Sequence, residues 1–252
     1  SAFDFQENII NKAIRKGRIG MFADTGLGKT LMQIVIAENI IRHTNKRVLI
    51  LTPLAVAFQF IDEATRIGVD DIAHSKDGSL TKKITVCNYE RLHLLNPEDF
   101  VCVMLDESSI LKNFAGKIRD QIVAFIKQVP YRFLSTATPS PNDFIELGNS
   151  SEALGYMGYM DMLSKFFKSN QGSADSNNRN IGEKFYLKPH AERDFFAWVN
   201  QWSVMVKKPS DLGFSDAGYE LPALHTKKHI VNNSNTWCLE GQESLFAMPA
   251  RT

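Results

Sequence analysis

The chain has 252 residues, of which 44% are hydrophobic and 23% are charged, a composition typical of a soluble globular protein with a substantial core. The net charge of +1 excludes a strong overall basic field, although a local basic groove stays open. No apolar stretch approaches the length of a membrane span, no pair of the three cysteines has metal-ligand spacing, and the first residues show no secretory pattern. We therefore expect a cytoplasmic protein that does not bind membranes.

Short apolar segments alternate with helical patterns over the first 135 residues. Strands are predicted at residues 19–22, 47–52, 84–87, 101–105 and 132–135. Several are continuous apolar runs, which is typical of strands covered on both faces. Apolar residues at helical spacing predict helices at residues 31–42, 54–66 and 115–127. The alternation predicts an α/β fold with a central, mostly parallel sheet and helices on both faces.

The pattern changes after Pro139. Helical spacing continues at residues 143–147, 156–167 and 191–201, and strand-like pieces occur at residues 203–207 and 224–231. Residues 168–182 are polar and nearly devoid of apolar side chains, so we predict a mobile surface loop there.

A glycine-rich segment, Ala-Asp-Thr-Gly-Leu-Gly-Lys-Thr, occupies residues 23–30 between a predicted strand and a predicted helix. Such a loop wraps the phosphates of a nucleoside triphosphate, because its backbone N–H groups and the helix N-terminus meet the negative charge. The side chain of Lys29 would reach the β- and γ-phosphates, and the Thr30 hydroxyl would bind Mg²⁺. The predicted nucleotide-binding residues of the loop are Thr25, Gly26, Leu27, Gly28, Lys29 and Thr30.

The strict phosphate-loop pattern has glycine where this chain has Ala23. An ordinary glycine turn with a chance lysine is the alternative, and the order of strand, loop and helix favours the nucleotide site. ATP and Mg²⁺ are the predicted cofactors.

Two carboxylates, Asp106 and Glu107, follow the apolar strand that begins at Val101. In phosphate-loop enzymes a carboxylate at this place holds Mg²⁺ and a neighbouring one orients the attacking water, so we assign these roles to Asp106 and Glu107. An isolated Asp-Glu pair would be read as solvated surface, but its position after a buried strand favours the catalytic interpretation. Lys29, Asp106 and Glu107 are the predicted catalytic residues.

These segments together resemble the first RecA-like lobe of the superfamily 2 helicases, and most closely the Snf-type DNA translocases. The loop at residues 23–30, in which Ala23 is then normal, is followed in the family's order by segments resembling its later motifs. These are Leu-Thr-Pro-Leu at 51–54, Thr-Val-Cys-Asn-Tyr-Glu at 85–90, Asp-Glu-Ser-Ser-Ile-Leu-Lys-Asn at 106–113 and Leu-Ser-Thr-Ala-Thr-Pro at 134–139. The resemblance covers residues 5–154.

The resemblance implies further roles. Thr136 and Thr138 would relay the state of the nucleotide to the nucleic-acid site. The implied nucleic-acid contacts are Thr52, Pro53, Asn88, Lys112 and Asn113.

Two features depart from the family pattern. Ser109 stands where the family usually has a histidine after the acidic pair. The adenine-reading element upstream is reduced to Phe5 and Gln6. The resemblance implies that Gln6 reads the adenine edge, and plain helix surface is the alternative.

In this family ATP lies between two RecA-like lobes, and the second lobe supplies arginine fingers. No second alternation of strands and helices follows Pro139, and the arginines there are Arg179, Arg193 and Arg251. Residues 205–209 and 219–222 resemble the bridge towards the second lobe. We therefore expect an ATP-binding lobe at residues 1–155, lobe completion and bridge at 156–231, and a tail or linker at 232–252.

The resulting prediction is the ATP-binding lobe of a nucleic-acid-dependent ATPase. Its expected partners are DNA, duplex in preference to RNA, and a second RecA-like lobe in cis or in trans. Two alternatives stay open: an ATP-binding interaction module with little turnover, and another phosphate-loop enzyme such as a kinase or ligase. The water-activating Glu107 argues against the last, since phosphotransfer has no need of it.

Overall fold

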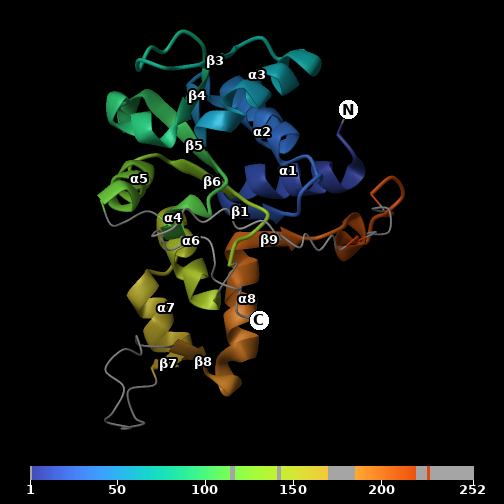
Figure 1. Cartoon of the computed structure of the whole chain (residues 1–252), viewed down its shortest axis with the longest axis vertical. Helices are drawn as coiled ribbons and strands as arrows, with labels where there is room; N and C mark the ends of the chain where they lie inside the picture. The colour runs from blue at the N-terminus through green and yellow to red at the C-terminus, as the bar shows by residue number, and fades with distance from the viewer. Residues whose placement is uncertain (1, 114–116, 141–142, 170–184, 220–225, 228–252) are drawn as a thin grey trace, which may run out of the picture. The chain divides into compact units, whose positions relative to one another are not determined.

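The computed structural model describes residues 2–113, 117–140, 143–169, 185–219 and 226–227. All but the last two residues belong to one compact unit, Ser1–Tyr219. Within it, seven parallel strands form one sheet in the order β3-β4-β2-β5-β6-β1-β9 (Figure 1). The strands are β1 (Arg18–Ala23), β2 (Arg47–Thr52), β3 (Ile72–His74), β4 (Ile84–Asn88), β5 (Phe100–Asp106), β6 (Tyr131–Ser135) and β9 (Ser203–Val206).

Helices cover both faces of this sheet. One face packs against α1 (Asp4–Lys16), α2 (Lys29–Thr44) and α3 (Ala57–Arg66), and Figure 1 shows these helices on the opposite side of the strands from α5. The other face packs against α5 (Lys117–Lys127), α6 (Leu147–Leu154), α7 (Tyr159–Phe166) and α8 (Glu192–Trp202). A short helix, α4 (Ile110–Asn113), precedes α5.

The alternation of side chains along the strands explains the two cores. On β2, Val48 and Ile50 point into the core with α1–α3, and Leu49 and Leu51 point into the other core. All four side chains are fully buried. A strand with both faces covered needs apolar residues at every position, which is the run that predicted it.

The predicted α/β fold with a parallel sheet is confirmed. Of the strands of this sheet, β3 was missed: it has only three residues and is partly exposed, so it lacks a buried apolar run. The strand-like piece at residues 203–207 becomes β9, which pairs with β1 at the edge of the same sheet. The piece at residues 224–231 lies almost entirely outside the described residues.

The prediction of a mobile loop at residues 168–182 is wrong for its first two residues. Lys168 and Ser169 end β7 (Phe167–Ser169), which pairs antiparallel with β8 (Phe185–Leu187). The buried Phe167, opposite Leu187, anchors this pair to the core, and hydrogen bonds between the strands then order the polar residues that follow. Residues 170–182 lie outside the described part of the chain.

None of the helices in the described part is long and apolar enough to cross a membrane.

Candidate active site

Parallel strands place their carboxyl ends at one edge of the sheet, and the polar residues predicted for catalysis follow those ends. Strands β2, β5, β6 and β1 are neighbours in the sheet. Thr52, Asp106, Ser135 and Ala23 are their last residues. The phosphate loop, the acidic pair and Thr136 therefore meet at this edge.

The phosphate loop turns into α2 at Gly28, which has a φ of +78°. This left-handed conformation favours glycine, and a Cβ atom at this position would collide with the amide of Gln6. The Nε2 atom of Gln6 donates to the carbonyl of Leu27 at 3.0 Å, and its Oε1 accepts from the backbone N–H of Phe3. Gln6 is 3% exposed, so the interpretation of Gln6 as plain helix surface is wrong.

The Lys29 ammonium folds back onto the glycine-rich loop at residues 23–28. Its Nζ donates to the carbonyls of Ala23 at 2.9 Å and Asp24 at 3.0 Å. Burial lowers the pKa of Lys29, and the nearby charges of Asp106 and Glu107 act in the opposite direction. An ammonium held by two carbonyls can exchange them for phosphate oxygens, which are stronger, charged acceptors. Thr30 follows in the first turn of α2 and is half-buried.

Asp106 is 9% exposed, and neutral side chains hold its carboxylate. Gln33 Nε2 donates to Oδ1 at 2.9 Å, and Thr52 Oγ1 donates to Oδ2 at 3.4 Å. The buried hydroxyl of Tyr89 donates to the backbone carbonyl of Asp106 at 2.6 Å. Burial raises the pKa of Asp106, and the hydrogen bond from Gln33 partly offsets it. A buried carboxylate with few compensating charges suits a divalent cation.

Glu107 has a φ of +54°, a left-handed conformation that is uncommon for a residue with a side chain. Its Oε1 accepts from Thr136 Oγ1 at 2.6 Å and from Ser109 Oγ at 2.5 Å. Thr136 Oγ1 in turn accepts from the backbone N–H of Thr138 at 3.0 Å. Glu107 is thus joined directly to the segment that follows β6.

The predicted nucleic-acid residues do not form one surface. Thr52 is fully buried and bonds to Asp106, while Pro53 after it is half-buried. Asn88 is 1% exposed, and its Oδ1 accepts from His74 Nε2 at 3.0 Å. Lys112 and Asn113 end α4, and their side chains lie outside the described part of the structure.

Gln33 and Tyr89 also contact Asp106, and no sequence motif assigned them a role. Gln33 is fully buried on α2, and its Oε1 has no hydrogen-bond partner among the described residues. It lies about one helical turn after Lys29, so a polar residue on an otherwise apolar helix face was the available signal.

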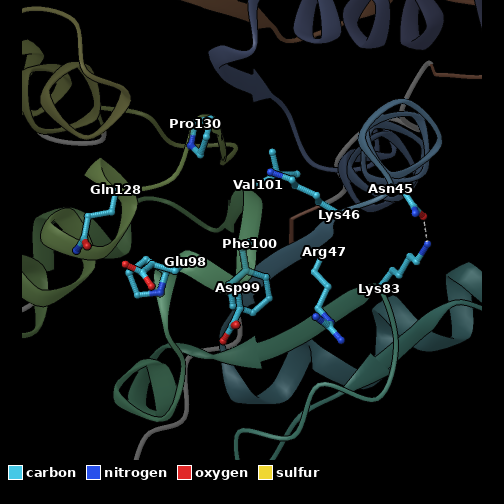
Figure 2. A pocket seen from close by; sticks show the side chains of 11 residues that line it. Asn45, Lys46, Arg47, Lys83, Glu98, Asp99, Phe100, Val101, Gln128 and Pro130 are labelled. Atoms are coloured by element: carbon cyan, nitrogen blue, oxygen red, sulfur yellow. Dashed lines mark hydrogen bonds between the residues drawn. The ribbon is translucent and has the colours of Figure 1, made fainter.

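A cavity of about 640 Å³ lies at the opposite, amino edge of the sheet (Figure 2). Figure 2 shows Arg47 and Lys83 on one side of Phe100, and Glu98 on the other. The charged side chains of Arg47, Glu98 and Asp99 are exposed, so they do not enclose a ligand-binding pocket. This cavity is separate from the cluster around Asp106.

Searches among protein-family models and among curated proteins give no match for this chain. Solved structures of helicase ATPase cores do match it. The SWI2/SNF2 ATPase core of Sulfolobus solfataricus in complex with dsDNA is similar with a TM-score of 0.61 and 18% identity, over 81% of this chain and 44% of that one.

Two helicases extend the comparison. The UvsW helicase from bacteriophage T4 has a TM-score of 0.52 and 16% identity, over 63% of this chain and 58% of that one. The Hef helicase domain of Pyrococcus furiosus has a TM-score of 0.50 and 19% identity, over 64% of this chain and 39% of that one. At these identities the likeness establishes the fold. The predicted resemblance to helicase ATPase cores is confirmed for the fold.

Proposed function

We propose that this chain is the ATP-binding lobe of a nucleic-acid-dependent ATPase of the Snf-like helicase and translocase type. The observation that carries the proposal is the convergence of Lys29, Asp106, Glu107 and Thr136 at the carboxyl edge of a parallel sheet. Ligands of open α/β folds bind at this edge.

The residues at this edge fit Mg-ATP. The left-handed conformation of Gly28 lets the loop turn into α2, and Lys29 supplies a cation beside it. Thr30 and Asp106 would hold Mg²⁺, which neutralises phosphate charge when bound. The unpartnered Oε1 of Gln33 is an acceptor suited to a water molecule beside Asp106.

Hydrolysis needs a base that orients water, and we assign this role to Glu107. Its carboxylate is fixed by Thr136 and Ser109, so it is oriented before the substrate binds. Thr136 and Thr138 would then couple hydrolysis to the nucleic-acid site, because the same hydroxyl bonds both Glu107 and the Thr138 backbone. Gln6 would contact the adenine from its place against the phosphate loop.

A second RecA-like lobe, in cis or in trans, would complete the site. The cation that acts on Asp106 in the described part of the chain is Lys29, and Arg193 is exposed on α8. An arginine finger contributes roughly 10³–10⁵-fold to hydrolysis in related NTPases. The proposed nucleic acid is DNA, duplex in preference to RNA. The support is the Sulfolobus structure, which is a complex with dsDNA.

Calorimetry with Mg-ATP tests the nucleotide site. Lys29→Ala should abolish measurable binding, because it removes the cation facing the phosphates. The matched control is Lys46→Ala, an exposed lysine at the amino edge of the sheet, which should bind like the wild type. Equal binding by wild type and Lys29→Ala would overturn the site.

Hydrolysis with and without duplex DNA tests the second lobe. The 252-residue chain alone should hydrolyse ATP slowly and respond weakly to DNA, because stimulation works by closing two lobes on the nucleotide. Addition of a second lobe should restore turnover. Robust DNA-stimulated hydrolysis by the monomeric chain would contradict this requirement. ATP binding without turnover, even after a second lobe is added, would favour the alternative of an interaction module.

A further inference from the structure

A large aromatic side chain is exposed near the carboxyl edge of the sheet, where packing does not require it. Phe58, on α3, is 58% exposed, while Phe60 on the same helix is fully buried in the core. Leu54, four residues before Phe58, is 60% exposed. Both follow the end of β2 at Thr52. Their position on the segment that leaves the carboxyl end of β2 makes these exposed side chains candidate contacts for a partner.

The Phe58 ring is held by polar and cationic neighbours. The His74 ring packs edge-on against it, with centroids 5.5 Å apart and an interplanar angle of 80°. The Lys76 Nζ lies 5.4 Å from the ring centroid. Both neighbours come from one segment, the end of β3 and the turn after it, which packs against α3 at this ring.

Polar groups without partners lie behind this ring. Asn88 is 1% exposed and accepts from His74, but its Nδ2 has no hydrogen-bond partner among the described residues. The same holds for the Oγ of Ser75, which is 3% exposed. Leaving a buried donor unsatisfied costs about 1–3 kcal/mol. Such donors are therefore expected to face an internal water molecule, which would hold Asn88 and, through it, His74 in place.

We propose that Phe58, Leu54, His74 and Lys76 form a stacking platform, the Phe58 platform, for an unpaired base of a nucleic-acid strand. The base lies on the exposed face of Phe58, and Lys76 lies beside the strand's phosphates. The inference rests on the proposed nucleic-acid-dependent function.

The chemistry of the platform favours a nucleic acid over a protein partner. Its apolar area is two side chains bordered by a lysine and a histidine, which complements a polyanion with flat apolar bases. An unpaired base is required because the bases of a closed duplex expose only their edges in the grooves. Stacking on an aromatic side chain contributes about 1–3 kcal/mol per base.

Binding of labelled DNA to the chain, measured by fluorescence anisotropy, tests the platform. The probes are a single strand, a blunt duplex and a duplex with a single-stranded overhang. Phe58→Ala should weaken binding of the single strand and the overhang by about 5- to 150-fold, the equivalent of 1–3 kcal/mol. It should leave the blunt duplex unchanged. Phe58→Trp should retain wild-type binding, because it preserves the aromatic face.

A matched control is Tyr186→Ala, which removes an exposed aromatic side chain from β8 and should change no affinity. A 2-aminopurine base in the overhang should lose fluorescence on binding to the wild type and not to Phe58→Ala. Thermal melting of both variants checks that they fold.

Wild-type binding by Phe58→Ala would overturn the platform, and so would an equal loss on all three probes. A wild-type chain that binds none of the probes would also overturn it. The nucleotide site would survive either result if Mg-ATP binding still depended on Lys29. Loss of that dependence, with stacking intact, would instead remove the ATPase proposal.

Discussion

A charged side chain is buried at each edge of the sheet: Arg132 at the amino edge and Asp106 at the carboxyl edge. The two side chains have different kinds of hydrogen-bond partner. Arg132 is 6% exposed. Its Nε, Nη1 and Nη2 donate to the backbone carbonyls of Val129 at 2.8 Å, Ala153 at 3.3 Å and Lys127 at 2.6 Å. The carbonyls at a helix end lack helical partners, so Arg132 satisfies acceptors that α5 and α6 leave open.

Asp106 has side-chain partners instead. Gln33 and Thr52 donate to its carboxylate, and Lys29 lies close enough to favour its charged form. Side chains can exchange partners when a ligand arrives, while the backbone carbonyls around Arg132 are fixed by their helices. Burial of charge alone therefore does not identify a site. For these two residues, the kind of partner separates the structural charge from the one that is available for chemistry.

The largest expected effect is on hydrolysis, from Glu107→Gln at the carboxyl edge. The amide keeps an oxygen for Thr136 but cannot accept a proton from water, so hydrolysis by the complete two-lobed assembly should fall about 10²–10⁴-fold. Mg-ATP affinity, measured by calorimetry, should stay within about twofold, because Lys29 and Asp106 are intact.

The control for this change is Glu98→Gln, an exposed carboxylate at the amino edge, which should leave both quantities unchanged. If Glu107→Gln abolished binding as completely as Lys29→Ala, Glu107 would be part of the binding site, and another base would have to be found.

At the amino edge the large effect should be on stability. Arg132→Met keeps much of the apolar stem but leaves three carbonyls without a donor. The free energy of unfolding, from urea titration, should fall by about 3 kcal/mol. Mg-ATP affinity extrapolated to the folded protein should not change. A stable variant with impaired ATP binding would contradict the structural role given to Arg132.

The sequence predicted the central sheet because its physical signal is local. A strand covered on both faces reads as an apolar run, and Val48 to Leu51 provide one. The short edge strand β3 has no such run, since only Ile72 of its three residues is fully buried. The pairing of β9 with β1 joins residues about 180 positions apart, and periodicity carries no information about such a partner.

For the site, the sequence predicted the residues that follow the ends of strands. It did not predict which helix residues would contact those strand-end residues. Asp106 and Thr136 were placed at one edge because parallel strands end there. Gln33 comes from α2, and its contact with Asp106 depends on the rotation of that helix against the sheet. The same limit applies to Phe58, because the spacing on α3 did not reveal that Phe60 enters the core and Phe58 does not.

Asp106→Asn should show that the site costs stability. Burial raises the pKa of Asp106, so its contribution to stability is fully present below the ordinary carboxyl pKa and is lost as pH rises through the raised value. At neutral pH the variant should be more stable than the wild type by roughly 0.5–2 kcal/mol, as is common when a functional residue is removed.

The difference between the two proteins should shrink as pH falls, which thermal melts across pH 4–8 would reveal. Asp99→Asn, an exposed carboxylate at the amino edge, is the control and should give no such difference. A destabilised Asp106→Asn at neutral pH would mean that Gln33 and Thr52 overcompensate the burial of the charge.

The smallest effect should come from an exposed charge near Arg132. Lys127 Nζ lies 3.0 Å from Glu152 Oε1, with side chains 46% and 29% exposed, and it joins the end of α5 to α6. The hydrogen bond from Lys127 holds the pKa of Glu152 below its usual value, so its contribution is present at neutral pH and is lost as pH falls through the lowered pKa. Lys127→Met should lower the free energy of unfolding by only about 0.2–1 kcal/mol, less at high salt, since water and ions screen exposed pairs. A loss of unfolding free energy as large as that of Arg132→Met, and unaffected by 1 M salt, would contradict this expectation. It would show that the Lys127–Glu152 ion pair and the buried Arg132 guanidinium stabilise the protein as one unit.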